Sequence, residues 1–271
     1  MNGDYADVNG LRMYYETHGP AGGTPLVLLH GALSATGTSF GAVLPDLAKT
    51  RRVISVEWQA HGHTADIPDR PLRIPTLAQD AAAFIDQLGA APVDLFGYSV
   101  GASIAAEVAI RRPELVRRLV LASVGLGPSG LHPGVLDGIE HVSAELMVGS
   151  PFEQEYLRVA PHPERWPDLV EKIKDLDLTL TDLTPEEFAS ISAPTLLIAG
   201  DSDIITLEHV VMLFRLLVGG VMGMPDAMPA SQLAIFPSTS HVDVAERPEL
   251  MLAIVPPFLD AADADPTTPM S

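Results

Sequence analysis

Short apolar runs alternate with amphipathic stretches along most of the chain. Such runs are typical of strands that are buried on both faces of a sheet. The runs are Leu26–Leu29, Val53–Val56, Val93–Phe96, Leu119–Leu121, Thr195–Ala199 and Leu233–Phe236. The helical patterns between and after them cover Phe40–Ala48, Thr76–Leu88, Val100–Arg111, Leu207–Val218 and Pro248–Asp260. This alternation predicts a parallel sheet with helices on both faces.

The N-terminal segment has the pattern of a β-hairpin. Strand-like stretches at Asp4–Val8 and Leu11–Thr17 flank Asn9-Gly10, which is the strongest two-residue signal for a hairpin turn. We expect this hairpin to pair at one edge of the sheet. Its two strands and the six apolar runs predict an α/β fold with a mostly parallel, eight-stranded sheet.

The alternation is interrupted between Ser123 and Thr195. Roughly 70 residues separate these two runs, and a connection of that length without structure of its own is uncommon in a compact domain. The stretch contains several helix-like pieces separated by prolines. We therefore predict a helical cap at 125–192, inserted into a core formed by 1–124 and 193–260, with a long irregular connection as the alternative. Residues 261–271 are acidic and proline-containing and predict a flexible tail.

Composition excludes several classes of function. The 271 residues include no cysteine, so disulfides and thiolate catalysis are ruled out. The formal net charge of −19 repels nucleic acids and anionic membranes, and we expect neither as a partner. No apolar stretch is long enough to span a membrane, and Met1–Tyr5 lacks the order of a secretory signal, which predicts a cytoplasmic protein.

The role of one Met-rich loop has two interpretations. The Met-rich stretch 219–230 is typical of adaptable binding surfaces, so a homo-oligomer contact is one interpretation. We favour a loop between a helix and the last strand whose apolar side chains pack down.

A serine lies in a setting that favours nucleophilic catalysis. Gly97-Tyr98-Ser99-Val100-Gly101 follows an apolar run and precedes a stretch of small residues, which predicts a strand, a sharp turn and a helix with Ser99 at the apex. Glycines two residues before and after the serine give such a turn the clearance that it needs. A serine hydroxyl exposed there becomes a nucleophile when a base and backbone N–H donors lie near it.

The base and its orienting acid should follow other strands of the sheet, because loops after parallel strands meet at one edge. His241 follows the last apolar run directly and is the preferred base. The competing histidines that also follow strands are His30, His61 and His63. Asp201 and Asp203 are the acidic residues directly after the run Thr195–Ala199.

These residues give the chain a specific resemblance. It is similar to the α/β-hydrolases, whose members carry a serine, an acid and a histidine in the chain order of Ser99, Asp203 and His241. The resemblance covers almost the whole chain outside the predicted insertion. The family pattern G-x-x-D is met by Gly200 to Asp203, which favours Asp203 over Asp201 as the acid.

The resemblance also implies an oxyanion hole. His30-Gly31-Ala32 follows the first apolar run, as the family's His-Gly loop does, which implies that the backbone N–H of Ala32 is one donor. The N–H of Val100, at the start of a helix, would be the second.

Residues 57–64 resemble the family loop Asp-x-x-Gly-x-Gly-x-Ser but depart from it in two places. Glu57 stands for the usual Asp and Ala60 for the usual Gly, which puts the geometry of that turn in question. His61 and His63 could bind a metal together with a carboxylate such as Asp66, but no residue is a compelling third ligand. We expect no metal and no cofactor.

We predict a serine hydrolase that cleaves carboxylic esters of small to medium neutral substrates through an acyl-enzyme. A serine nucleophile argues against epoxide hydrolases and dehalogenases, which use a carboxylate on this fold. Carbon–carbon bond hydrolysis, lactone opening and perhydrolysis use the same triad and remain open. A non-catalytic receptor for a small ligand is the alternative from another class. The apolar residues Leu131, Leu136, Met147, Phe152 and Trp166 predict either an apolar pocket or the core of the cap.

Overall fold

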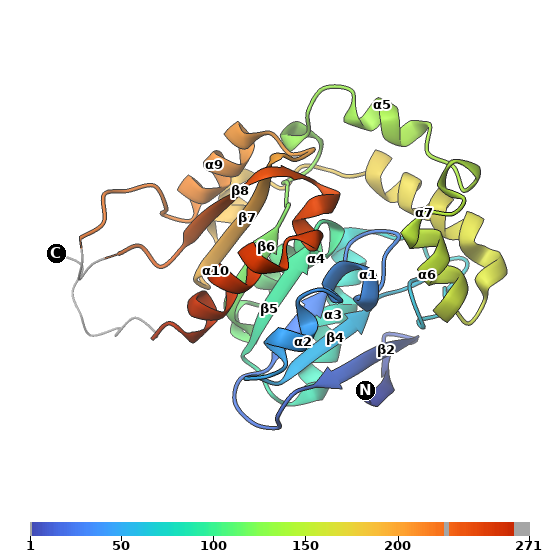
Figure 1. Cartoon of the computed structure of the whole chain (residues 1–271), viewed down its shortest axis with the longest axis horizontal. Coiled ribbons are helices and arrows are strands. Elements are labelled where there is room, and N and C mark those ends of the chain that lie inside the picture. Colours follow the sequence, from blue (N-terminus) through green and yellow to red (C-terminus); the bar gives the residue numbers. More distant parts are fainter. Residues whose placement is uncertain (1, 225–227, 263–271) are drawn as a thin grey trace.

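The fold is organised around one eight-stranded sheet, seen in a computed structural model that describes residues 2–224 and 228–262. Its strand order is β1-β2-β4-β3-β5-β6-β7-β8 (Figure 1). The strands are β1 (Asn2–Val8), β2 (Leu11–His18), β3 (Leu26–Leu29), β4 (Val53–Glu57), β5 (Val93–Tyr98), β6 (Val116–Ala122), β7 (Thr195–Ser202) and β8 (Gln232–Ser240). The hairpin β1-β2 pairs antiparallel with β4, and β3 to β8 pair in parallel. The predicted mostly parallel α/β sheet is confirmed.

Helices cover both faces of the sheet because the strand residues alternate between them. Val27 and Leu29 point to the core that contains α3 and α4, whereas Leu26 and Leu28 point to the core that contains α2 and α10. The helices are α1 (Thr36–Phe40), α2 (Leu44–Leu47), α3 (Ile74–Leu88), α4 (Val100–Arg111), α5 (Val135–Glu140), α6 (Pro151–Val159), α7 (Trp166–Leu178), α8 (Pro185–Ala189), α9 (Leu207–Leu216) and α10 (Pro248–Asp260). Short 3₁₀ helices span Pro113–Leu115, Pro128–Gly130, Glu145–Met147, Pro163–Arg165 and Val242–Glu246. In the described part of the chain, no helix combines the length and apolarity that crossing a bilayer requires.

The single helix predicted over Phe40–Ala48 is wrong. The structure has two short helices there, α1 and α2, and Gly41 forms the C-cap of α1. Pro45 lies in the first turn of α2, where its missing N–H costs nothing, and it could not continue a helix from α1. The chain therefore stops and restarts within the predicted stretch.

The segment between β6 and β7 carries helices, as its sequence pattern predicts. Figure 1 shows α5, α6 and α7 grouped at one side of the molecule, away from α2 and the C-terminal part of α10. Helix α8 instead packs against α4 and α9, and its Phe188 is completely buried. The last helix of this segment thus belongs to the layer that covers the sheet. Of the tail predicted at 261–271, residues 263–271 lie outside the described residues.

The Met-rich loop does not pack down, so that interpretation is wrong for its described residues. Val218, Val221, Met222, Met224 and Met228 are all exposed, and Met222 keeps 89% of its surface. The reason is topological. Val218 takes a left-handed conformation with φ 60° just after α9, and the chain then leads to β8, an edge strand with no further strand of the described residues beyond it.

We expect Phe188→Ala to lower the free energy of unfolding by about 3–5 kcal/mol, because it leaves a cavity between α8, α4 and α9. Urea unfolding followed by circular dichroism measures this. Leu157→Ala on α6 is the matched control, since Leu157 is half exposed, and it should change stability by less than about 1 kcal/mol. Equal effects of the two variants would contradict this packing.

Candidate active site

Ser99 occupies a strained turn between β5 and α4. Its φ of 55° and ψ of −123° lie where L-residues are rarely found, and α4 begins at the next residue. A Cβ at Gly97 would lie 2.2 Å from the Gly101 carbonyl oxygen, and one at Gly101 would lie 2.1 Å from the Leu29 carbonyl oxygen. Glycine is therefore required at both positions, and the turn presents the serine hydroxyl at the end of the strand.

Three predicted residues form one hydrogen-bonded chain. His241 Nε2 lies 2.9 Å from Ser99 Oγ, and His241 Nδ1 lies 2.7 Å from Asp203 Oδ1. A carboxylate can only accept, so Nδ1 carries the proton and the lone pair of Nε2 faces the serine hydroxyl. Asp203 follows β7 and His241 follows β8, so neighbouring strand ends bring them to Ser99. The arrangement can remove the proton of Ser99 as its oxygen attacks.

Asp203 is buried yet held in its ionised form. Burial raises its pKa, but hydrogen bonds from His241, Ser123 and the Ile205 N–H outweigh this and hold the pKa below its ordinary value. Ser123 Oγ donates to Oδ2 at 2.6 Å, and the Ile205 N–H donates to Oδ1 at 3.3 Å. The carboxylate therefore keeps its charge at neutral pH, and its fixed orientation sets that of the imidazole.

The alternative acid, Asp201, has a different place. Its two oxygens accept the backbone N–H groups of Ser238 at 2.8 Å and Thr239 at 3.1 Å. These bonds lower its pKa. Asp201 thus secures the end of β8 just before His241, and Asp203 is the carboxylate that contacts the imidazole.

The competing histidines bind other partners. His30 Nδ1 lies 2.8 Å from the Gly31 carbonyl, and burial lowers the pKa of His30 to about 4. His61 Nδ1 lies 2.9 Å from the Gln59 carbonyl, and its Nε2 accepts the Leu33 N–H at 3.1 Å. Burial also lowers the pKa of His61 well below its ordinary value. Both rings are neutral supports of the loop around Gly31, and His61 holds Leu33, whose φ is 56°.

Ala32 and Val100, the predicted oxyanion donors, belong to the loop after β3 and to the start of α4. Both line the same cavity as Ser99 and His241. Val100 is the first residue of α4, where a backbone N–H has no acceptor within its own helix. A Cβ at Gly31, next to Ala32, would lie 3.4 Å from the Ser99 Cβ, so this loop passes close to the serine.

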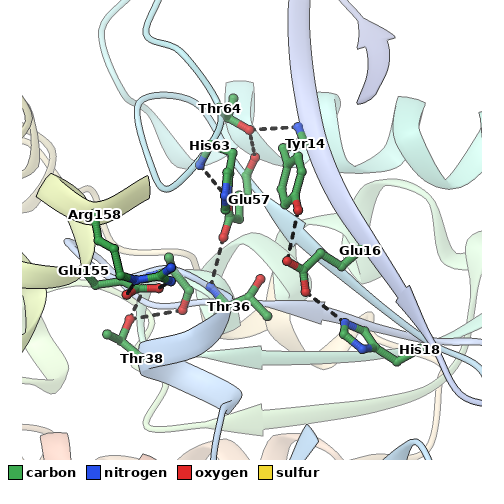
Figure 2. A network of polar contacts seen from close by, with 11 residues as sticks. Tyr14, Glu16, His18, Thr36, Thr38, Glu57, His63, Thr64, Glu155 and Arg158 are labelled. Atoms are coloured by element: carbon green, nitrogen blue, oxygen red, sulfur yellow. Dashed lines mark hydrogen bonds and ion pairs between the residues drawn. The ribbon is translucent and has the colours of Figure 1, made fainter. Parts of the chain in front are cut away.

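Glu57 organises the loop whose sequence departs from the family pattern. Its carboxylate accepts the backbone N–H of His63 at 2.7 Å, His63 Nδ1 at 2.9 Å and the Thr36 N–H at 3.3 Å (Figure 2). A Cβ at Gly62 would lie 2.2 Å from this carboxylate, so the longer acid fills the space that the glycine leaves. Ala60 adopts the left-handed conformation itself, with φ 67°. The turn is therefore intact despite both departures.

The same network engages Nδ1 of His63, which was one candidate ligand for a metal site. Figure 2 shows His63 directed at Glu57, with Tyr14 beside it, and the two rings stack at 4.1 Å between centroids. The hydrogen bond that His63 Nδ1–H donates to the Glu57 carboxylate raises the pKa of His63. In residues 2–224 and 228–262, no group of three ligand side chains could hold a metal ion. Asp66 instead pairs with Lys172 of α7 at 2.7 Å.

A cavity of about 850 Å³ opens over Ser99. Its walls combine the turn at Ser99 and the first residues of α4 with residues of α5 and α7. Of the apolar residues singled out from the sequence, Leu131, Leu136 and Phe152 line the cavity. Trp166 is buried against Tyr156, and Met147 packs against the main core. Some of these residues thus form an apolar pocket and others pack in the core, so each of the two interpretations holds for part of the set.

Sequence reasoning missed three residues of the site. Ser123 holds Asp203, the Tyr98 hydroxyl donates to the His241 carbonyl at 2.9 Å, and Asp177 of α7 lines the cavity. Tyr98 lies within the serine motif, which marks it as close to the site. Ser123 follows an apolar run, as the other site residues do, and this placement was the signal that could have found it.

Comparison with known proteins agrees with this architecture. The model of the alpha/beta hydrolase family matches residues 26–254. Over 129 residues the chain is 35% identical to 2-hydroxymuconate semialdehyde hydrolase of a Pseudomonas species, covering 46% of this chain and 44% of that protein. Over 132 residues it is 33% identical to an sn-1-specific diacylglycerol lipase of Mus musculus, covering 48% of this chain and 41% of that protein. These two alignments span less than half of either relative.

A solved structure extends the likeness to nearly the whole chain. The meta-cleavage product hydrolase from Pseudomonas fluorescens superposes with a TM-score of 0.75 at 18% identity, covering 96% of this chain and 98% of that one. At this identity the superposition shows a shared fold.

The buried neutral state of His30 predicts a pH-dependent stability. Its pKa is about 4 in the folded protein against 6.5 for a free histidine, so the unfolded chain binds a proton first as the pH falls. Stability is therefore lost from pH 6.5 towards 4, by about 2 kcal/mol at pH 5 for this group. In urea unfolding, His30→Gln should lose about 2 kcal/mol less than the wild type between pH 7.5 and 5. His162→Gln, at an exposed position, should follow the wild type, and so would His30→Gln if this account were wrong.

Proposed function

Because the chain belongs to the alpha/beta hydrolase family, we propose that it is a serine hydrolase that cleaves carboxylic esters of small to medium neutral substrates. The observation that carries this proposal is the unbroken chain of hydrogen bonds from Asp203 through His241 to Ser99. It supplies a nucleophile, a base and an orienting acid within direct contact.

In the proposed reaction, His241 Nε2 takes the proton of Ser99 as Oγ forms a bond to the acyl carbon. The carbonyl oxygen becomes an oxyanion held by the backbone N–H groups of Ala32 and Val100. The C–O bond to the alcohol then breaks, and His241 returns the proton to the leaving alcohol. Asp203 stays ionised throughout and stabilises the imidazolium. The product is an acyl ester of Ser99.

Water then hydrolyses the acyl-enzyme, with water as the nucleophile and Ser99 as the leaving group. His241 removes a proton from water as its oxygen attacks the acyl carbon. The tetrahedral intermediate collapses, the acid leaves, and the proton passes to Ser99 Oγ. Every proton has a donor and an acceptor among Ser99, His241, the leaving alcohol and water, so this scheme requires no cofactor.

Substrate choice is assigned to the inserted segment. We propose that the insertion at 125–192 caps the core formed by 1–124 and 193–260 through α5, α6 and α7, whereas its last helix, α8, packs against α4 and α9 of that core. Leu136 of α5 and Ile173 of α7 line the cavity together with Ser99. A cavity of about 850 Å³ with such apolar walls accommodates a small to medium acyl or alcohol group.

Hydrolysis of a carbon–carbon bond or a lactone is the second candidate for the same triad. The similarity to 2-hydroxymuconate semialdehyde hydrolase favours it. The two candidates separate experimentally when kcat/KM for a chromogenic ester is compared with kcat/KM for a lactone and a diketone of similar size.

We expect Ser99→Ala to lower kcat for p-nitrophenyl butanoate by at least about 10³-fold, since the nucleophile is lost. Initial rates with circular dichroism as a folding control measure this. Activity of the variant within tenfold of the wild type would rule out Ser99 as nucleophile. The absence of turnover of any short ester by the wild type would rule out the esterase proposal.

The two aspartates form a matched pair. Asp203→Asn should lower kcat by roughly 10⁴-fold, because the amide no longer fixes the tautomer of His241 that can act as base. Asp201→Asn removes the same charge two residues away and should lower kcat far less, through the end of β8 alone. A larger loss in Asp201→Asn would reverse the assignment of the acid.

A further inference from the structure

One carboxylate of the cavity has no protein partner. Asp177 lies in the last turn of α7, is half-buried, and lines the same cavity as Ser99 and His241. Within the described part of the chain it makes no hydrogen bond or ion pair. The triad scheme above gives it no role.

The cations around this cavity are already paired. Arg73 binds Asp175 at 2.7 Å, and Lys174 binds Glu171 at 2.9 Å. Arg111 binds both Glu107 at 3.0 Å and Glu187 at 2.8 Å. The remaining lining carboxylate, Asp182, accepts the Ser129 N–H at 3.1 Å. Asp177 is thus the charged lining group that the protein leaves uncompensated.

The surroundings of Asp177 make its charge costly without a partner. The last turn of α7 carries no basic residue, and the carbonyl end of a helix repels a negative charge. Burial raises the pKa of Asp177 to about 6, and only His241 acts in the opposite direction. A positive group in the cavity would remove this cost, whereas an anionic substrate would increase it.

We propose that Asp177 binds a positively charged group on the substrate, such as a quaternary ammonium, and makes the protein selective for cationic esters. This inference rests on the proposed esterase function and extends its substrate class from neutral to cationic esters. Asp177 would bind a part of the substrate that lies away from the reacting carbonyl group. The apolar walls, including Leu136 and Phe152, suit the methyl groups of such an ion.

The test compares esters of equal shape and different charge. One pair carries the charge on the acyl side, as p-nitrophenyl esters of 4-(trimethylammonio)butanoate and 5,5-dimethylhexanoate. The other carries it on the alcohol side, as butanoates of choline and 3,3-dimethylbutanol. In one of the pairs we expect the wild type to favour the cationic ester by about tenfold in kcat/KM.

Asp177→Asn should reduce that ratio of kcat/KM values by about tenfold. The ratio is the decisive readout, because an effect of Asp177 through the imidazole of His241 would change both esters equally and cancel. Asp168→Asn is the matched control. It removes the same charge from α7 at an exposed ion pair with Arg165 and should preserve the ratio. Asp177→Ser serves as a second variant if the amide destabilises α7.

A binding measurement separates this inference from the esterase proposal. In Ser99→Ala protein, isothermal titration with butyltrimethylammonium should show binding that Asp177→Asn weakens about tenfold, with no turnover needed. Equal kcat/KM for both members of each pair, with ester turnover intact, would overturn the role of Asp177 alone. Loss of all ester turnover with charge-dependent binding retained would overturn the esterase proposal alone. Equal binding in both proteins would overturn the role of Asp177 in either case.

Discussion

The site depends on one backbone constraint, the positive φ that Ser99 adopts. The chain must leave β5, reverse at this residue and begin α4 within a single step, which brings the backbone of Gly101 against the Leu29 carbonyl. That close approach forbids side chains at Gly97 and Gly101. It also directs the serine hydroxyl to His241 and leaves the N–H of Val100 at the free end of a helix. Nucleophile and proposed oxyanion donor thus follow from the same turn.

The parallel sheet converts this turn into a site by aligning strand ends. Asp203, His241 and Ser123 each follow a strand that neighbours another strand of the site, so residues distant in sequence meet at one edge. Asp201 at the end of β7 and Asp203 just after it have different partners. Asp203 binds the imidazole, and Asp201 binds the backbone just before it. A pair of carboxylates two residues apart therefore has separate partners.

Much of this architecture could be predicted because it is written in local patterns. Asn9-Gly10 marks a hairpin and each apolar run marks a strand, since both signals arise from neighbouring residues. The single helix predicted over Phe40–Ala48 is wrong because its apolar pattern runs across Pro45, which lies in the first turn of a separate helix. The exposure of the Met-rich loop could not be predicted in this way. It depends on the position of β8 at the edge of the sheet, which is a property of the whole sheet.

The residues that escaped prediction act through contacts between distant elements. Ser123 matters because it donates a hydrogen bond to Asp203 from the end of the neighbouring strand. Its place after an apolar run indicates the edge of the sheet at which it lies, but not that contact. Asp177 stands out only when the partners of every other charge around the cavity are known. Glu57 and Ala60 departed from the expected pattern, yet the carboxylate of Glu57 takes the space beside Gly62 and restores the turn.

The central claim is that Ser99 carries the acyl group during turnover. Rapid-quench mass spectrometry of the protein mixed with p-nitrophenyl butanoate tests it most directly, with peptide mapping to locate the adduct. The account predicts a butanoyl ester on the peptide that contains Ser99, formed within the first turnover and lost in Ser99→Ala. An adduct on another residue, or steady ester turnover with no covalent adduct at any time, would contradict it.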